Sequence, residues 1–137
     1  MNLYIDSSVL LRRALRQPGA LAPIAFERTL SSVVIRVECW RTLDRLRLLR
    51  PDSSEAIVDR AEAVLRGLRP LEMIPLNQDI LERAARPLPV VLGTLDALHL
   101  ASAQLWREKT GQDILLATHD RQLSLAARAS GLAVVGA

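Results

Sequence analysis

Short apolar runs alternate with segments of helical spacing along this chain, and this alternation limits the fold more than any other feature. Leu3-Tyr4-Ile5 precedes a helical segment from Val9 to Leu15, and Ile114-Leu115-Leu116-Ala117 precedes one from Arg121 to Ser130. The runs are apolar throughout, which is typical of strands buried on both faces. We therefore expect an α/β fold, a three-layer α/β/α sandwich around a central parallel sheet.

The remaining elements are predicted from the same periodicities and from capping signals. Strands are expected at Ser32–Ile35, Met73–Leu76 and Leu132–Val135, and helices at Val37–Leu49, Ile57–Leu68, Ile80–Ala85 and Leu95–Trp106. The first two of these helices are expected to form a hairpin. The residues expected to cap helices are Ser7 or Ser8, Asp52 with Glu55 as a capping box, Asn77 and Thr94.

The length of 137 residues suits one domain, which we place at residues 1–137. The apolar runs stay well below the ~18 residues of a membrane span, and no secretory signal is visible. A single cysteine, Cys39, cannot form an internal disulfide. These features predict a soluble, cytoplasmic protein with no membrane partner.

The formal net charge is +3, and the cations are arginines except for Lys109. Arginine suits phosphate recognition because its planar group presents a fork of donors. The charge alone favours a nucleic-acid partner only weakly. Arginines at 12, 13, 16, 41 and 45 would hold RNA phosphates or form a solvated face, and the sequence leaves both interpretations open.

Four acids are predicted at strand ends or helix starts. Asp6 follows the first strand, Glu38 and Asp96 lie near the starts of helices, and Asp120 follows the run Ile114–Ala117. Ligands of parallel α/β sheets bind at the carboxyl ends of the strands. We therefore expect the four side chains to share one edge of the sheet.

Four carboxylates at one edge would repel one another unless a cation neutralised them. Oxygen ligands alone suit Mg²⁺ or Mn²⁺, and such a metal can promote attack by water on a phosphodiester. The acids predict hydrolysis of phosphodiesters on this basis. A local interpretation stays open for each acid near a helix start, because capping and the helix dipole also favour it there, by roughly 0.3 to 1 kcal/mol.

The whole chain resembles the PIN-domain ribonucleases, and among them the VapC-like toxins of toxin–antitoxin pairs. The motifs that carry the resemblance are Tyr4-Ile5-Asp6-Ser7-Ser8, Ser32 with Val37-Glu38, Leu95-Asp96-Ala97-Leu98-His99-Leu100-Ala101 and Leu116-Ala117-Thr118-His119-Asp120. Each motif is short, but their order along the chain is specific. Arg36 and Val37 depart from the smaller or hydroxyl residues common before the family's glutamate.

The resemblance implies a Mg²⁺- or Mn²⁺-dependent endoribonuclease whose acids are Asp6, Glu38, Asp96 and Asp120. It implies that Thr118 orients a carboxylate or a water molecule. It also implies an RNA substrate, a homodimer, and a cognate antitoxin whose C-terminal segment places an arginine near the acids.

Two other functions stay open. A phosphatase of the haloacid-dehalogenase kind also has an aspartate after its first strand, but it needs a second aspartate where this chain has Ser8. A catalytically silent PIN-like module would bind RNA or protein without cleaving. His99, three residues after Asp96, is expected to support the acids or to pack against the sheet, and not to act as an acid or base.

Overall fold

The computed structural model describes residues 1–23 and 25–137, and these residues form five strands and six helices. In chain order the elements are β1 (Asn2–Ile5), α1 (Ser7–Ala14), β2 (Thr29–Ser32), α2 (Val34–Leu49), α3 (Ser54–Leu68), β3 (Glu72–Ile74), α4 (Gln78–Ala84), α5 (Thr94–Thr110), β4 (Ile114–Ala117), α6 (Arg121–Ala129) and β5 (Ala133–Val135).

The strands form one parallel sheet in the order β3-β2-β1-β4-β5. The first strand is central, and its register pairs Tyr4 with Leu30 on one side and with Leu116 on the other. The chain runs outward from β1 in both directions, so β1 lies at the point where the strand order reverses. A crevice for ligands forms at the carboxyl end of such a strand.

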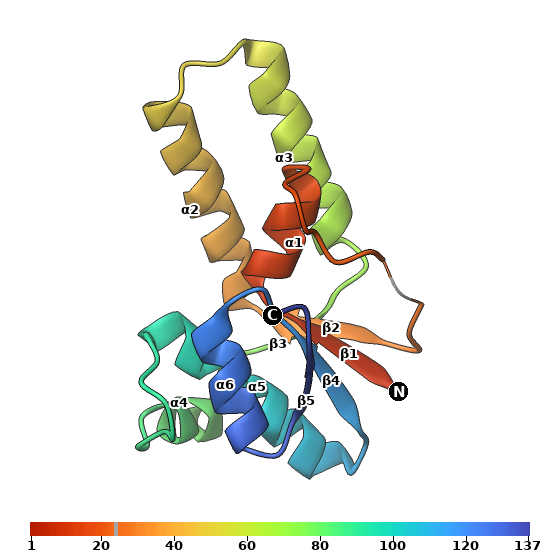
Figure 1. The fold of residues 1–137 in the computed structure, drawn as a ribbon, viewed down its shortest axis with the longest axis vertical. Helices are drawn as coiled ribbons and strands as arrows, with labels where there is room; N and C mark the ends of the chain where they lie inside the picture. The colour runs from red at the N-terminus through yellow and green to blue at the C-terminus, as the bar shows by residue number, and fades with distance from the viewer. Residues whose placement is uncertain (24) are drawn as a thin grey trace.

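Helices cover both faces of the sheet, as Figure 1 shows. On one face, Val9 of α1, Ile35 of α2 and Val64 of α3 pack with Ile5. On the other, α5 and α6 pack with β1, β2 and β4, while α4 lies against α5. A fully buried aliphatic side chain of this kind contributes roughly 1.5 to 3 kcal/mol. The predicted three-layer sandwich is confirmed.

The predicted hairpin of α2 and α3 is also confirmed, and it projects beyond the sheet (Figure 1). Its far end exposes the side chains of Leu48 and Leu49. No helix in the described part of the chain combines the length and the apolar character needed to cross a membrane.

The strand predicted at Ser32–Ile35 is wrong in its bounds. Strand β2 ends at Ser32, and α2 already begins at Val34. Ile35 and Cys39, four residues apart on one helix face, are fully buried against α1 and α3. The β-branched run therefore begins a helix, because tertiary packing outweighs the β propensity of these residues, a scale that spans only about 1 kcal/mol.

The first helix is capped by Asp6 and not by Ser7 or Ser8 as predicted. Asp6 has extended backbone angles, and its carboxylate accepts the N–H of Val9. The two serines instead occupy the first turn of α1. Their hydroxyls are thereby free to contact acids at the same edge of the sheet.

Two further capping predictions are wrong and one is confirmed. Ser53, and not Asp52, caps α3, while Gly93 precedes α5 with Thr94 already inside the helix. Asn77 caps α4 by accepting the N–H of Ile80. Capping residues that are adjacent in sequence compete for one site, so a one-residue error is the usual failure of such predictions.

Candidate active site

The four predicted acids lie on four separate segments of the chain that meet at the carboxyl edge of the sheet. Asp6 follows β1, Asp96 lies in the first turn of α5, and Asp120 is the N-cap of α6. Glu38 lies one turn further into α2 than the sequence predicted, because that helix begins at Val34. Parallel strands therefore bring together residues that lie far apart in the sequence.

Asp6 is almost fully buried, with 3% of its surface exposed. Its Oδ1 accepts hydrogen bonds from the hydroxyl of Ser8 at 2.6 Å and from the N–H of Val9 at 3.2 Å. Its Oδ2 accepts one from the hydroxyl of Thr118 at 2.5 Å. A carboxylate oxygen has two lone pairs, so Oδ1 is saturated and Oδ2 keeps one for a ligand.

Thr118 links Asp6 to the segment that carries Asp120. Its hydroxyl donates to Asp6 and accepts the N–H of Asp120 at 3.0 Å. Asp120 in turn caps α6, since its Oδ1 accepts the N–H of Leu123 at 2.9 Å. The capping role left open by the sequence is therefore present at Asp120, and one carboxylate oxygen remains available beside it.

Glu38 is held by two donors from other elements. Its Oε2 accepts a hydrogen bond from the hydroxyl of Ser7 at 3.0 Å, and its Oε1 lies 2.5 Å from Nε2 of His99. The side chain of His99 is fully buried and that of Glu38 is 12% exposed. His99 thus contacts Glu38 from the buried side, which is one of the two placements expected from the sequence.

Asp96 has the clearest electrostatic signature of the four acids. Burial, followed by the charges of Asp120, Asp6 and Glu38, raises its pKa to about 6, while His99 opposes the shift. Such coupling requires the four carboxylates to lie near one another. Like charges held together in this way are typical of functional sites.

The described residues contain no group of three His, Cys, Asp or Glu side chains arranged closely enough to hold a metal ion directly. The donor set nevertheless suits a hard divalent cation, because it consists of carboxylates, and burial and then the charges of the other three raise the pKa of Asp96. Mg²⁺ usually takes only one or two carboxylates directly and keeps several water molecules. The residues therefore fit a loosely held, hydrated cation.

Four residues of the site's hydrogen-bond network were not predicted from the sequence to take part in it. They are Tyr4, Ser7, Ser8 and Ser32. The available signal was their position, since three of them flank Asp6 in the first motif. Only the fold shows that Ser8 also accepts the N–H of His119, across the sheet edge at 2.9 Å.

Two of the five arginines considered for RNA binding already have partners. Arg13 donates to the carbonyl oxygen of Leu21 at 3.0 Å, and Arg41 pairs with Asp44 at 2.5 Å. A cavity of about 890 Å³ lies between α1 and α3, and none of the four acids lines it. The acids therefore face a different part of the surface from this cavity.

Comparisons with known proteins identify the family and the fold of the chain. A family model described as PIN domain matches residues 3–129. Ribonuclease VapC46 of Mycobacterium tuberculosis is 32% identical over 142 residues, which cover 97% of this chain and 95% of the relative.

Two solved structures are similar in fold at 14% identity. One, from VapBC-5 of Mycobacterium tuberculosis, covers 99% of this chain and 98% of its own with a TM-score of 0.62. The other, from VapBC-1 of nontypeable Haemophilus influenzae, covers 98% and 97% with a TM-score of 0.54. Identity at this level supports the fold alone, while the family model and the VapC46 relative cover nearly the whole chain. The chain belongs to the PIN-domain family.

Proposed function

We propose that this protein is a metal-dependent endoribonuclease and the toxin of a toxin–antitoxin pair. The observation that carries the proposal is the meeting of Asp6, Glu38, Asp96 and Asp120 at one sheet edge, where burial and then the charges of the other three acids raise the pKa of Asp96. The relative VapC46 is named a ribonuclease. Residues 1–137 would act as one domain in the cytoplasm.

The cation of the proposed site would be Mg²⁺ or Mn²⁺, with Asp6 and Asp96 as direct ligands. Asp6 offers its remaining lone pair on Oδ2, and the carboxylate of Asp96 accepts no side-chain hydrogen bond within the described residues. Glu38 and Asp120 would contact the cation directly or through water. When bound, the cation would lower the pKa of a water molecule and stabilise charge on a phosphate oxygen.

The chain's own residues would prepare this site before RNA arrives. Thr118 and Ser8 fix both oxygens of Asp6, and Ser7 fixes Glu38. Preorganised donors of this kind reduce the reorganisation needed during the reaction. Arginines on α1 and α2 that lack an ion pair among the described residues, such as Arg12 and Arg45, would attract the RNA backbone.

An antitoxin protein is the proposed partner, because both structural neighbours are named as VapBC proteins and one as a member of a toxin–antitoxin family. The chain would also form a homodimer. An antitoxin would silence the nuclease by covering the acidic edge, and its basic side chains would complement the four carboxylates.

The Asp6→Asn variant tests the proposed activity. Asparagine caps a helix about as well as aspartate, so the fold should survive. We expect RNA cleavage with Mn²⁺ and growth inhibition by the wild type, and loss of both in the variant. Asp113→Asn serves as control, because Asp113 is an exposed acid beside the opposite end of β4.

An Asp6→Asn variant that cleaves as well as the wild type would contradict the proposal. A wild type that binds RNA but cleaves none with any divalent metal would identify the alternative, a catalytically silent PIN-like binding module.

A further inference from the structure

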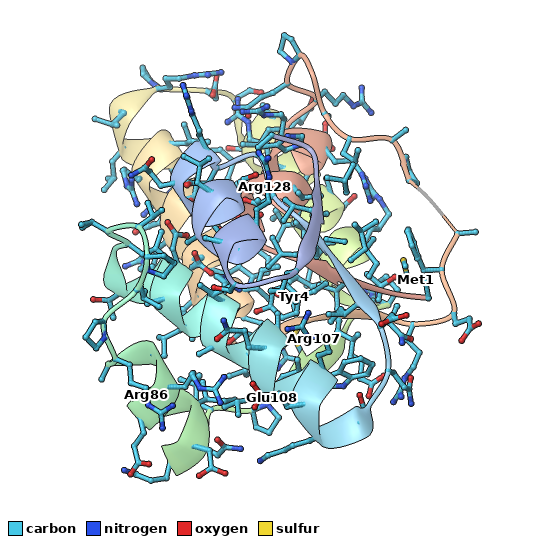
Figure 2. The ribbon with its side chains drawn as sticks, turned by 60° about the horizontal axis from the view of Figure 1, so that its bottom comes forward. Met1, Tyr4, Arg86, Arg107, Glu108 and Arg128 are labelled. Carbon is cyan, nitrogen blue, oxygen red and sulfur yellow. The ribbon has the colours of Figure 1, made fainter. Side chains whose placement is uncertain are left out.

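Glu38 is joined to the buried core by a chain of two aromatic side chains. Nε2 of His99 lies 2.5 Å from Oε1 of Glu38, and Nδ1 of His99 lies 2.7 Å from the hydroxyl of Tyr4. Tyr4 and His99 are both fully buried, and their rings meet edge to face. Figure 2 shows Tyr4 inside the molecule, away from surface residues such as Met1 and Arg86.

The direction of the hydrogen bonds follows from what each atom can donate. The carboxylate of Glu38 can only accept, so the bond at 2.5 Å places the imidazole proton on Nε2 of His99. Nδ1 then accepts the phenolic proton of Tyr4, whose oxygen also accepts the N–H of Ser32 at 3.0 Å. A neutral imidazole that accepts at one nitrogen carries its proton on the other. Nε2–H of His99 therefore donates to Glu38.

We propose that Tyr4 and His99 are positioning residues that orient Glu38, with Tyr4 holding His99 in the tautomer protonated at Nε2. The proposal rests on the proposed function, in which Glu38 belongs to the cation site. His99 lies one turn after Asp96 on α5, so this hydrogen bond also joins the helix of Asp96 to that of Glu38. Removing the donor would let the carboxylate of Glu38 rotate.

The second histidine of the chain provides an internal reference. Nδ1 of His119 lies 2.8 Å from the carbonyl oxygen of Gly136, which can only accept, and Nε2 accepts the N–H of Leu21 at 3.3 Å. His119 therefore carries its proton on Nδ1. The chain contains two histidines, and the hydrogen bonds assign opposite tautomers to them.

Long-range ¹H–¹⁵N NMR spectra of the metal-free protein at pH 7.5 measure both tautomers directly. We expect one histidine protonated at Nε2 and one at Nδ1, with His119→Gln removing the second set of signals. Tyr4→Phe should move the Nδ1 resonance of His99 toward that of a nitrogen without a hydrogen bond and leave His119 unchanged. A doubly protonated or Nδ1-protonated His99 in the wild type would overturn the proposal.

Three variants measure the effect on Glu38. The amide nitrogen of glutamine can replace Nε2–H as a donor, whereas leucine cannot. We expect His99→Leu to weaken Mn²⁺ binding and to lower kcat about 10- to 100-fold with little change in KM for RNA, and His99→Gln to recover most of both. Tyr4→Phe should fall between wild type and His99→Leu.

The outcomes separate this proposal from the proposed function. Equal losses in His99→Gln and His99→Leu would mean that His99 only fills space, and the positioning role would be wrong. If His99→Leu does not fold, the tautomers of the wild type and the Nδ1 resonance of His99 in Tyr4→Phe still test the positioning role. A protein with the expected tautomers and Mn²⁺ binding that cleaves no RNA would contradict the nuclease and leave the positioning of Glu38 intact.

Discussion

The hydroxyl of Thr118 donates a hydrogen bond to Oδ2 of Asp6 at 2.5 Å, although 112 positions separate the two residues in the chain. Parallel pairing of β1 with β4 brings them together, because Ile5 pairs with Ala117 and the next residue of each strand reaches the same edge. The register of two central strands thus sets the geometry of the candidate cation site.

Replacing Thr118 by valine keeps the shape of the side chain and removes its hydroxyl. The N–H of Asp120 then loses its acceptor, at a cost of about 1 to 3 kcal/mol. Freed rotation of Asp6 should lower RNA cleavage about 10- to 100-fold. Urea unfolding and cleavage rates check both effects, with Thr42→Val on α2 as control. Activity unchanged in Thr118→Val would remove Thr118 from the site.

The stability of the metal-free protein should depend on pH through Asp96. Its pKa of about 6 exceeds the ordinary value near ~3.9, so the folded chain binds more protons than the unfolded chain. The resulting penalty is complete above about pH 6 and disappears as the pH falls toward ~4. Asp96→Asn should therefore stabilise the protein by about 1 kcal/mol at pH 7.5, after allowance for solvent screening, and little at pH 4.

Urea unfolding at both pH values measures this difference. Glu55→Gln is the matched control, because Glu55 also lies in the first turn of a helix but far from the other acids. If Asp96→Asn were no more stable than the wild type at pH 7.5, burial and the neighbouring acids would not raise the pKa of Asp96 as described.

Two substitutions of Asp120 distinguish its capping role from its place at the site. Asp120→Asn keeps an oxygen to accept the N–H of Leu123, so stability should stay close to that of the wild type. Asp120→Ala removes the cap and should cost about 1 kcal/mol. Both should impair cleavage. Full activity in a folded Asp120→Asn variant would show that Asp120 is only a cap.

Gly136 supports the site from the C-terminal end of the chain. Its φ is +104°, and a Cβ atom there would lie 2.7 Å from the carbonyl oxygen of Thr118. A Cβ atom added to Gly131, whose φ is +82°, would meet no other atom within 4 Å. Gly136→Ala should therefore lose more stability than Gly131→Ala, which bears only the conformational cost of about 1 kcal/mol, and should also slow cleavage. Equal thermal stability of the two variants would contradict this contact.

The sequence predicted the sheet and its main helices because their apolar periodicities are strong. The run Ile114–Ala117 matches β4 residue for residue, and α5 ends before Gly111 as expected. The prediction failed at Val34 and Ile35, where β-branched residues lie in a helix. Local pattern cannot reveal that Ile35 packs against α1 and α3, because that contact depends on the fold.

The candidate site was predictable in its acids and in Thr118 and His99 as residues that support them, but not in which acid each of these two contacts. Asp6, Glu38, Asp96 and Asp120 follow from strand ends, helix starts and short motifs. Several of their hydrogen-bond partners come from distant segments, and no spacing in the sequence relates Tyr4 to Glu38 through His99. Such contacts become visible only when the strand order is known.

Calorimetric titration of Mn²⁺ into the purified, partner-free protein tests the central claim most directly, that acids from four separate segments form one cation site. The account predicts binding by the wild type, equal binding by Glu55→Gln, and at least tenfold weaker binding by Asp96→Asn. RNA cleavage should be lost in Asp96→Asn, and chelator should abolish cleavage by the wild type. No binding by the wild type, or unchanged binding by Asp96→Asn, would contradict it.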